Sequence, residues 1–319
     1  MSEAPATGQL QPGLLARCGC HAPAFWQQGW LLRLESDGAK QAAALIQPSL
    51  LWGFALPLLE RLQGLAATGV RPLIALNGPV GAGKSSLARC LHQLAPLLGL
   101  RLAVASIDDA YLPWAERREA LAGNPFGVSR VPPGSHDTSL LVERLSHWRA
   151  GGELVLPRFD KTLRGGQGDR CGDDTLQADA VVLEGWLLGC RSLGSALSTV
   201  AGAPTAWLTP EEEVWLPRWD AALGAYAPLG EPALGLVDGL WVLHPSGWQL
   251  PLRWRLQAEA RQRRAGGAAL PASAVAAIVR ATLASLPPAL YQDPLLHNAN
   301  AAAVIDGRRR CLRVVVGDA

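Results

Sequence analysis

The chain has 319 residues, of which 49% are hydrophobic and 18% are charged, and its formal net charge at pH 7 is +2. This length and composition predict one large α/β domain or one domain with a helical annex, without extensive disorder. The small net charge gives no electrostatic argument for nucleic-acid binding. No apolar run reaches the roughly 18 residues that a membrane span needs, and the first residues lack the features of a secretory signal. We therefore expect a cytoplasmic protein that binds neither nucleic acid nor membrane.

Six cysteines are spread along the chain without a repeated CxxC spacing. This pattern predicts neither a disulfide framework nor a zinc site, and most of the thiols are expected to be buried. The one local cluster, Cys18, Cys20 and His21, places three potential ligands within four residues. Such a short segment cannot easily surround one ion, so we expect no metal site there.

The pattern of the chain changes near residue 70. Up to that point apolar residues recur at helical spacing, which predicts a helical N-terminal annex over residues 1–70. From Pro72 onwards short apolar runs alternate with helical stretches, as in βαβ units with buried parallel strands. Residues 161–174 are charged and Gly-rich and are expected to form a surface loop. We expect strands at 73–76, 102–105, 154–156, 180–183, 205–208, 240–243 and 303–305, and helices at 84–98, 137–149, 211–223, 249–264 and 271–286.

A phosphate-binding loop lies between the first predicted strand and the helix that follows it. Residues 78–85 fit G-x-x-x-x-G-K-[ST] at every fixed position. The glycines let backbone N–H groups converge on a phosphate, and the helix N-terminus favours its negative charge. Lys84 is suited to span the terminal phosphates of ATP, and Ser85 to offer its hydroxyl to Mg²⁺.

The motif predicts a fold of the α/β class. We expect a P-loop NTPase three-layer sandwich with a mostly parallel sheet, built by residues 71–319. The predicted nucleotide-binding residues are Gly78, Pro79, Val80, Gly81, Ala82, Gly83, Lys84, Ser85 and Ser86.

Two carboxylates stand at the ends of predicted strands, where an open parallel sheet places its ligands. Asp108 follows the strand at 102–105, and Glu184 closes the strand at 180–183. In phosphoryl transfer to an alcohol, one carboxylate can accept the hydroxyl proton while another holds magnesium or its water. We assign these roles to Asp108 and Glu184, with Lys84 as the third catalytic residue. The neighbouring Asp109 is explained equally well as a capping or turn residue.

Three further segments carry charges or turn signals whose role the residues alone leave open. Residues 132–137 lead into a helix, and capping by Ser135 or Asp137 is the simpler explanation. Residues 158–170 gather cations and glycines, which suits either an anionic substrate or a solvated loop. Arginines 261, 263 and 264 end a predicted helix, where they either reach the γ-phosphate as a lid or stabilise the helix C-terminus.

Together these segments resemble the plant-type D-glycerate 3-kinase family, whose relatives include uridine kinase, phosphoribulokinase and pantothenate kinase. The resemblance covers residues 78–189, whereas the C-terminal part is similar only more loosely and the first 70 residues show no match. It is carried by GPVGAGKSS at 78–86, SIDDAYL at 106–112, PPGSHD at 132–137, RFDKTLRGGQGDR at 158–170 and VVLEGWLLG at 181–189.

The resemblance implies transfer of the γ-phosphate of ATP, with Mg²⁺, to the 3-hydroxyl of D-glycerate, as in photorespiratory salvage. It also implies a lid at about 255–270 with Arg263 as its arginine, and a substrate loop at about 158–174. Glycerate is a carboxylate, and a cationic loop suits it. The substrate-binding residues expected on this basis are Asp109, Tyr111, His136, Asp137, Lys161, Arg164 and Arg170.

The sequence departs from the family pattern at Ala110, where the family usually has an aromatic residue after the Asp pair, and this departure affects the pocket of the acceptor. Another alcohol, such as a nucleoside, pantothenate or a sugar phosphate, is therefore an alternative acceptor. A nucleotide-binding regulatory protein that phosphorylates nothing is a third hypothesis. The sequence does not determine the oligomeric state.

Overall fold

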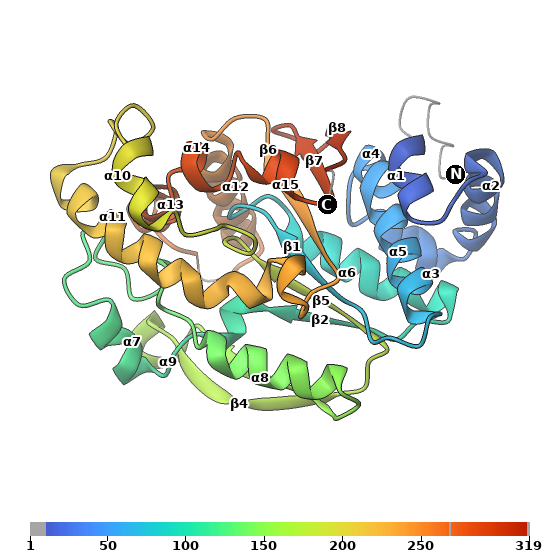
Figure 1. The fold of residues 1–319 in the computed structure, drawn as a ribbon, viewed down its shortest axis with the longest axis horizontal. Coiled ribbons are helices and arrows are strands. Elements are labelled where there is room, and N and C mark those ends of the chain that lie inside the picture. Colours follow the sequence, from blue (N-terminus) through green and yellow to red (C-terminus); the bar gives the residue numbers. More distant parts are fainter. Residues whose placement is uncertain (1–10, 268, 318–319) are drawn as a thin grey trace.

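The computed structural model describes residues 11–267 and 269–317 and is built around a six-stranded sheet (Figure 1). The strand order is β2-β5-β1-β6-β7-β8, and every neighbouring pair is parallel except β7 and β8. The predicted α/β fold with a mostly parallel sheet is thus confirmed. The strands are β1 (Leu73–Asn77), β2 (Leu102–Ser106), β5 (Ala180–Gly185), β6 (Gly239–Pro245), β7 (Ala301–Ile305) and β8 (Cys311–Val315).

Helices cover both faces of this sheet and make three layers. Successive residues of β1 belong to two different apolar clusters: Leu73 and Ala75 to one, Ile74 and Leu76 to the other. Because successive side chains of a strand point to opposite faces, the clusters are the two interfaces between sheet and helices. The first contains residues of α8 (Thr138–Arg149), α11 (Pro210–Leu223) and α13 (Ala272–Ser285), and the second residues of α6 (Lys84–Leu94) and α12 (Leu250–Arg264).

The N-terminal part of the described chain is helical, as expected, and gathers at one end of the molecule (blue in Figure 1). It shares the second apolar cluster with the sheet, and the Phe54 ring meets the Trp241 ring of β6 edge-on at 4.9 Å. The division into an annex over 1–70 and a kinase domain over 71–319 stays a prediction. The helices here are α1 (Pro12–Arg17), α2 (Pro23–Arg33), α3 (Asp37–Ala43), α4 (Pro48–Leu50), the π-helical turn η2 (Leu51–Ala55) and α5 (Leu56–Ala66).

The surface loop predicted for residues 161–174 is wrong in part, because this stretch belongs to a β-hairpin. β3 (Leu154–Asp160) pairs antiparallel with β4 (Asp169–Leu176), and a short helical turn, α9 (Leu163–Gly166), lies at the tip. β4 is solvent-exposed along most of its length. A strand without a buried face has no alternation of apolar and polar residues, which is why the sequence indicated a loop.

The strand predicted at 205–208 is also wrong. The Thr205 amide donates to the Gly202 carbonyl and the Leu208 amide to the Thr205 carbonyl, which are local turn bonds. Short apolar runs do not distinguish strands from other buried segments. The 3-10 turn η4 (Ile107–Ala110) follows β2 directly, and further helices are α7 (Trp114–Ala120), α10 (Leu197–Val200), α14 (Pro288–Tyr291) and α15 (Leu295–Asn298).

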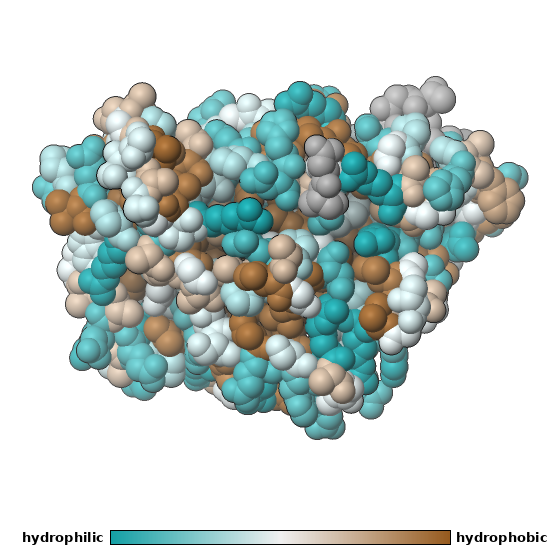
Figure 2. All heavy atoms as spheres, in the orientation of Figure 1, coloured by the Kyte–Doolittle hydropathy of each residue, from teal (hydrophilic) through white to brown (hydrophobic). Residues whose placement is uncertain are grey.

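The surface shows no extended apolar face in the view of Figure 2, where apolar residues lie in small groups among polar ones. Within the described ranges, no single helix is long and apolar enough to cross a bilayer. Two helix pairs, each bent at a break, are together long and apolar enough for a span by length and composition alone. Core helices of soluble proteins meet the same two conditions.

Candidate active site

The loop between β1 and α6 has the backbone that the glycine motif predicts. Gly81 and Gly83 have φ of 79° and 103°, a region that side chains with a Cβ rarely adopt. A Cβ on Gly81 would also lie 2.7 Å from the Cβ of Trp254, because α12 packs directly on the loop. The Lys84 ammonium folds back over the loop and donates to the Gly78 carbonyl at 2.7 Å. These residues therefore form a compact cradle at the start of α6.

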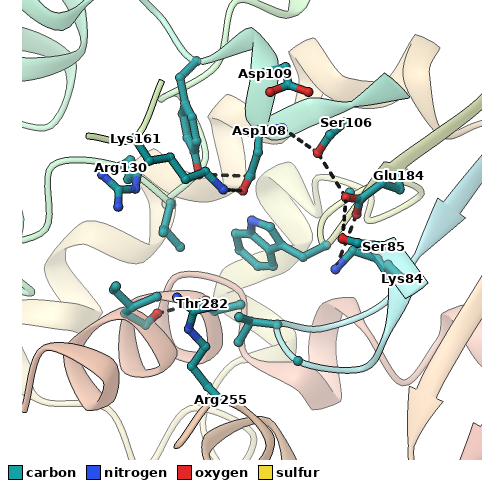
Figure 3. Close-up of a pocket in the computed structure, with 17 residues that line it drawn as sticks. Lys84, Ser85, Ser106, Asp108, Asp109, Arg130, Lys161, Glu184, Arg255 and Thr282 are labelled. Carbon is teal, nitrogen blue, oxygen red and sulfur yellow. Dashed lines mark hydrogen bonds and ion pairs between the residues drawn. The ribbon is translucent and has the colours of Figure 1, made fainter. Parts of the chain in front are cut away.

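Strand register places Glu184 beside this cradle. Glu184 of β5 is the register partner of Leu76 in β1 and of Ser106 in β2. Its carboxylate accepts hydrogen bonds from the hydroxyls of Ser85 at 3.3 Å and Ser106 at 3.1 Å, and lies 3.8 Å from the Lys84 ammonium (Figure 3). The sequence interpretation expected Lys84, Ser85 and Glu184 to share one site, and the sheet brings them together; the contact with Ser106 was not expected.

Ser85 and Glu184 are also the side chains suited to magnesium. A hydroxyl and a carboxylate offer the hard oxygen ligands that Mg²⁺ prefers. In the described part of the chain, no group of three or more His, Cys, Asp or Glu side chains could hold a metal by itself. The residues therefore fit an ion that completes its coordination with water and phosphate oxygens, as Mg²⁺ does in nucleotide sites.

Asp108 lies in η4, directly after β2, and is held by three neighbours. It accepts hydrogen bonds from the Lys161 ammonium at 2.8 Å and the Tyr111 hydroxyl at 3.1 Å, and His136 Nε2 lies 3.9 Å away. Burial alone would raise the pKa of Asp108, but the Lys161 charge and His136 together lower it well below the usual value. The carboxylate is therefore ionised at neutral pH.

His136 is the buried neighbour of this carboxylate. Its ring is buried, stacks on the Tyr111 ring at 4.2 Å and shares a 2.9 Å hydrogen bond with the Tyr226 hydroxyl. Burial lowers the pKa of His136, so the ring is neutral at pH 7. His136 thus acts on the site indirectly, by contacting Asp108 and Tyr111.

Arg170 connects the hairpin to the segments that carry Tyr111 and Asp137. Arg170 donates to the Tyr111 carbonyl at 2.6 Å and to the Asp137 carboxylate at 3.3 Å. Asp137 also caps α8 by accepting from the Leu140 amide, as the simpler interpretation predicted. Arg164 lies further out, where it pairs with Asp169 at 2.9 Å. The proposed substrate contacts of these residues stay predictions.

A cavity of about 430 Å³ opens beside the P-loop, and we call it the first cavity. Burial and the Asp108 charge raise the pKa of Asp109, in its wall, to about 6. Arg130 and Arg255 also line the wall, and the sequence interpretation gave neither of them a role. The predicted site residues in its wall are Val80, Gly81, Lys84, Ser85, Asp108, Asp109, Tyr111, Lys161 and Glu184.

A second cavity, of about 410 Å³, opens on the same loop. Residues 44–47 of the N-terminal part form one of its walls, and Arg261, Arg308 and Arg309 contribute positive charge. Arg309 is fixed against the loop because its guanidinium donates to the Gly81 carbonyl at 2.8 Å. The P-loop residues in this wall are Gly81, Ala82, Gly83, Lys84, Ser85 and Ser86.

Arg255 of α12 lines both cavities. It forms an ion pair with Glu259 at 2.7 Å, and its Nε is buried without a hydrogen-bond partner in the described structure. Arg263, the arginine predicted for the lid, lies at the end of the same helix and donates to the Leu270 carbonyl at 3.5 Å. Arg255 stands in the C-terminal part, where the sequence resembles the family only loosely, so no signal in the sequence singled it out from the other arginines of α12.

Two curated proteins are similar to this chain in sequence. The chain is 32% identical over 203 residues to the uncharacterized kinase mug58 of Schizosaccharomyces pombe, over 59% of this chain and 70% of that protein. It is 36% identical over 131 residues to the probable ATP-dependent kinase TDA10 of Saccharomyces cerevisiae, over 36% of this chain and 45% of that protein. No protein-family model matches the sequence.

Two solved structures share the fold. A D-glycerate 3-kinase from Cryptococcus neoformans matches with a TM-score of 0.65 at 22% identity, over 81% of this chain and 99% of that one. The YGR205w protein matches with a TM-score of 0.67 at 25% identity, over 82% of this chain and 96% of that one. With the P-loop, the sheet and the two cavities in place, the match to the fission-yeast protein decides the family. The chain belongs to the same family of P-loop kinases as that protein, and it is a phosphotransferase.

Proposed function

We propose that this kinase transfers the γ-phosphate of ATP to the 3-hydroxyl of D-glycerate and releases ADP and 3-phosphoglycerate. The observation that carries the proposal is that one cavity brings together the Lys84 ammonium, the Glu184 carboxylate and the ionised Asp108. A phosphate on the P-loop and a hydroxyl beside Asp108 would face each other across that cavity. The sequence resemblance to plant-type glycerate kinases and the name of the fungal structural neighbour support glycerate as the acceptor.

Lys84 and the loop amides hold the phosphates in this proposal. The ammonium now bonded to the Gly78 carbonyl would turn to the β- and γ-phosphates, with the start of α6 adding a favourable dipole. Asp108 orients the acceptor hydroxyl. Because its pKa is low it is a weak base, and it accepts the proton once the new O–P bond makes that hydroxyl acidic.

Ser85 and Glu184 would hold Mg²⁺, which neutralises charge on the phosphate oxygens as the phosphoryl group moves. Arg255 borders both cavities, which supports a contact between its guanidinium and the transferred phosphate. We assign it the role that the sequence interpretation gave to Arg263. The second cavity is the proposed site of the nucleoside part of ATP, because it shares the P-loop with the first.

The test is ADP release by the purified protein with ATP and magnesium, in the presence and absence of D-glycerate. The Lys84→Ala protein serves as the blank, since it lacks the charge that holds the phosphates. We expect D-glycerate to raise ADP release well above the rate without acceptor, and phosphorus NMR to identify 3-phosphoglycerate as the product.

Other outcomes separate the alternatives. Faster ADP release with a nucleoside, pantothenate or a sugar phosphate than with D-glycerate would keep the kinase and change its acceptor. ATP binding without stimulation by any of these acceptors would instead favour a regulatory nucleotide-binding protein.

A further inference from the structure

We infer that Arg130 binds the carboxylate of the acceptor and thereby selects hydroxy acids over neutral alcohols. The inference rests on the proposed function, and it assigns the part of the first cavity that would distinguish one substrate from another. Arg130 lies in the segment between α7 and α8, outside the P-loop and outside the two predicted carboxylate positions.

The hairpin tip holds the Arg130 side chain at the cavity wall. One guanidinium nitrogen, NH1, donates to the Gly166 carbonyl at 2.9 Å and to the Gln167 carbonyl at 3.1 Å. A guanidinium has five N–H donors on three nitrogens, so these two bonds use a single corner of the group. Across residues 11–267 and 269–317, no carboxylate forms an ion pair with Arg130. The guanidinium is therefore oriented by neutral partners, and its charge is left for a ligand.

A second guanidinium, that of Arg117, lies near Arg130. Arg117 is buried nearby, and its hydrogen bonds go to backbone carbonyls, among them those of Ser129 and Gly168. Burial and then the charge of Arg130 lower the pKa of Arg117, so the two guanidinium groups are close enough to repel each other. Lys161 is already paired with Asp108. An anionic group bound at Arg130 would relieve this repulsion.

The backbone beside Arg130 is strained. Val131, which also lines the first cavity, has a φ of 105°. A β-branched residue rarely adopts positive φ, and such strain persists only where the surrounding structure imposes it, commonly at ligand sites. The strained residue directly follows Arg130 in the chain, which links the conformation of this segment to the position of the guanidinium.

This placement defines how a small hydroxy acid would lie. Figure 3 shows Arg130 and Lys161 on the same side of the cavity as Asp108, with Arg255 on the other side and Lys84 and Glu184 at a third. A carboxylate on Arg130 puts the hydroxyl end of the same molecule near Asp108, within the space that opens towards the P-loop. Arginine binds carboxylates through two parallel hydrogen bonds, which fixes orientation as well as affinity. A neutral alcohol would leave the guanidinium unpaired and bind without a defined orientation.

The test compares D-glycerate with glycerol, a neutral molecule that keeps the hydroxyls and lacks the carboxylate. In Arg130→Met we expect the KM for D-glycerate to rise about 100-fold while the KM for ATP stays within about twofold. The slow reaction with glycerol should be unchanged, so the preference for the acid falls by the same factor. Arg130→Lys keeps the positive charge but lacks the planar guanidinium that forms two parallel hydrogen bonds, so its KM for D-glycerate should lie between those of the wild type and Arg130→Met.

Arg144→Met is the matched control. Arg144 also pairs with the hairpin, through Asp173 at 3.4 Å, and does not line the first cavity. This variant should leave the KM values for D-glycerate, ATP and glycerol unchanged. Melting temperatures of the three variants show whether any effect comes from a loosened hairpin, because a loosened hairpin would lower activity towards glycerol as well.

Calorimetric titration of D-glycerate into the protein with a non-hydrolysable ATP analogue separates this inference from the proposed function. Binding to the wild type that Arg130→Met weakens would support the carboxylate site even if no phosphate were transferred. A rise in the KM for ATP with an unchanged acid preference would overturn the inference and place Arg130 at the nucleotide. Absence of D-glycerate binding to the wild type would overturn it as well.

Discussion

Replacing Asp108 by Asn should lower kcat by about 100-fold or more and leave ATP binding nearly unchanged. Asp108 receives one hydrogen bond from Lys161 and one from Tyr111, each on a different oxygen. An amide has one acceptor oxygen, so one of these donors loses its partner, and no negative charge remains to orient the hydroxyl or take its proton. A 100-fold loss corresponds to about 2.7 kcal/mol of transition-state stabilisation.

The assay is a coupled measurement of ADP release at saturating D-glycerate, with ATP affinity measured separately by calorimetry. Asp174→Asn is the control, because it removes an exposed carboxylate of the hairpin that pairs with Arg158. This control should keep wild-type turnover. If Asp108→Asn also turned over at the wild-type rate, Asp108 would have no part in the chemistry. If it lost ATP affinity instead, the carboxylate would belong to the nucleotide site.

Three further comparisons test other parts of the site. Arg255→Met should lower kcat at least 10-fold, whereas Arg263→Met should change it little, and the reverse order would restore Arg263 as the lid arginine. Ala44 lies in the wall of the second cavity, and Ala44→Trp should raise the KM for ATP about 10-fold. The control Ala16→Trp, at an exposed position on α1, should leave this KM unchanged. Equal KM values for the two variants would remove residues 44–47 from the nucleotide site. Folding raises the pKa of Asp109 to about 6, so the protonated form stabilises the folded state and is lost as the pH rises. Between about pH 4 and pH 7 the melting temperature of the metal-free wild type should therefore fall relative to that of Asp109→Asn. Parallel curves of melting temperature against pH would contradict this.

The central sheet and the P-loop could be predicted because their signals are local. The apolar run at β1, the glycine turn and the apolar spacing of α6 lie within one short stretch of chain. The position of Glu184 could be predicted as well, since parallel strands that end at one edge bring their last residues together. Buried, regular elements thus leave a clear pattern in the sequence.

The parts that could not be predicted depend on contacts between distant segments. β4 and β8 have little burial, so their sequences carry no alternation that indicates a strand. Arg130 stands in an irregular segment, and only its contact with the hairpin tip brings it to the cavity. Arg255 is one of several arginines on α12, and the packing of Trp254 against Gly81 brings it, and not Arg261, to the wall of the first cavity.

The position of Arg255 between the two cavities has a consequence for how the enzyme would use ATP. If a ligand in one cavity changed the position of this side chain, the second ligand would meet an altered partner. Thermodynamic linkage requires that the nucleotide change the affinity for the acceptor by the same factor as the acceptor changes the affinity for the nucleotide. If the arginine reached its productive position only when both cavities were filled, water would be a poor substitute for the acceptor, and futile hydrolysis of ATP would stay slow.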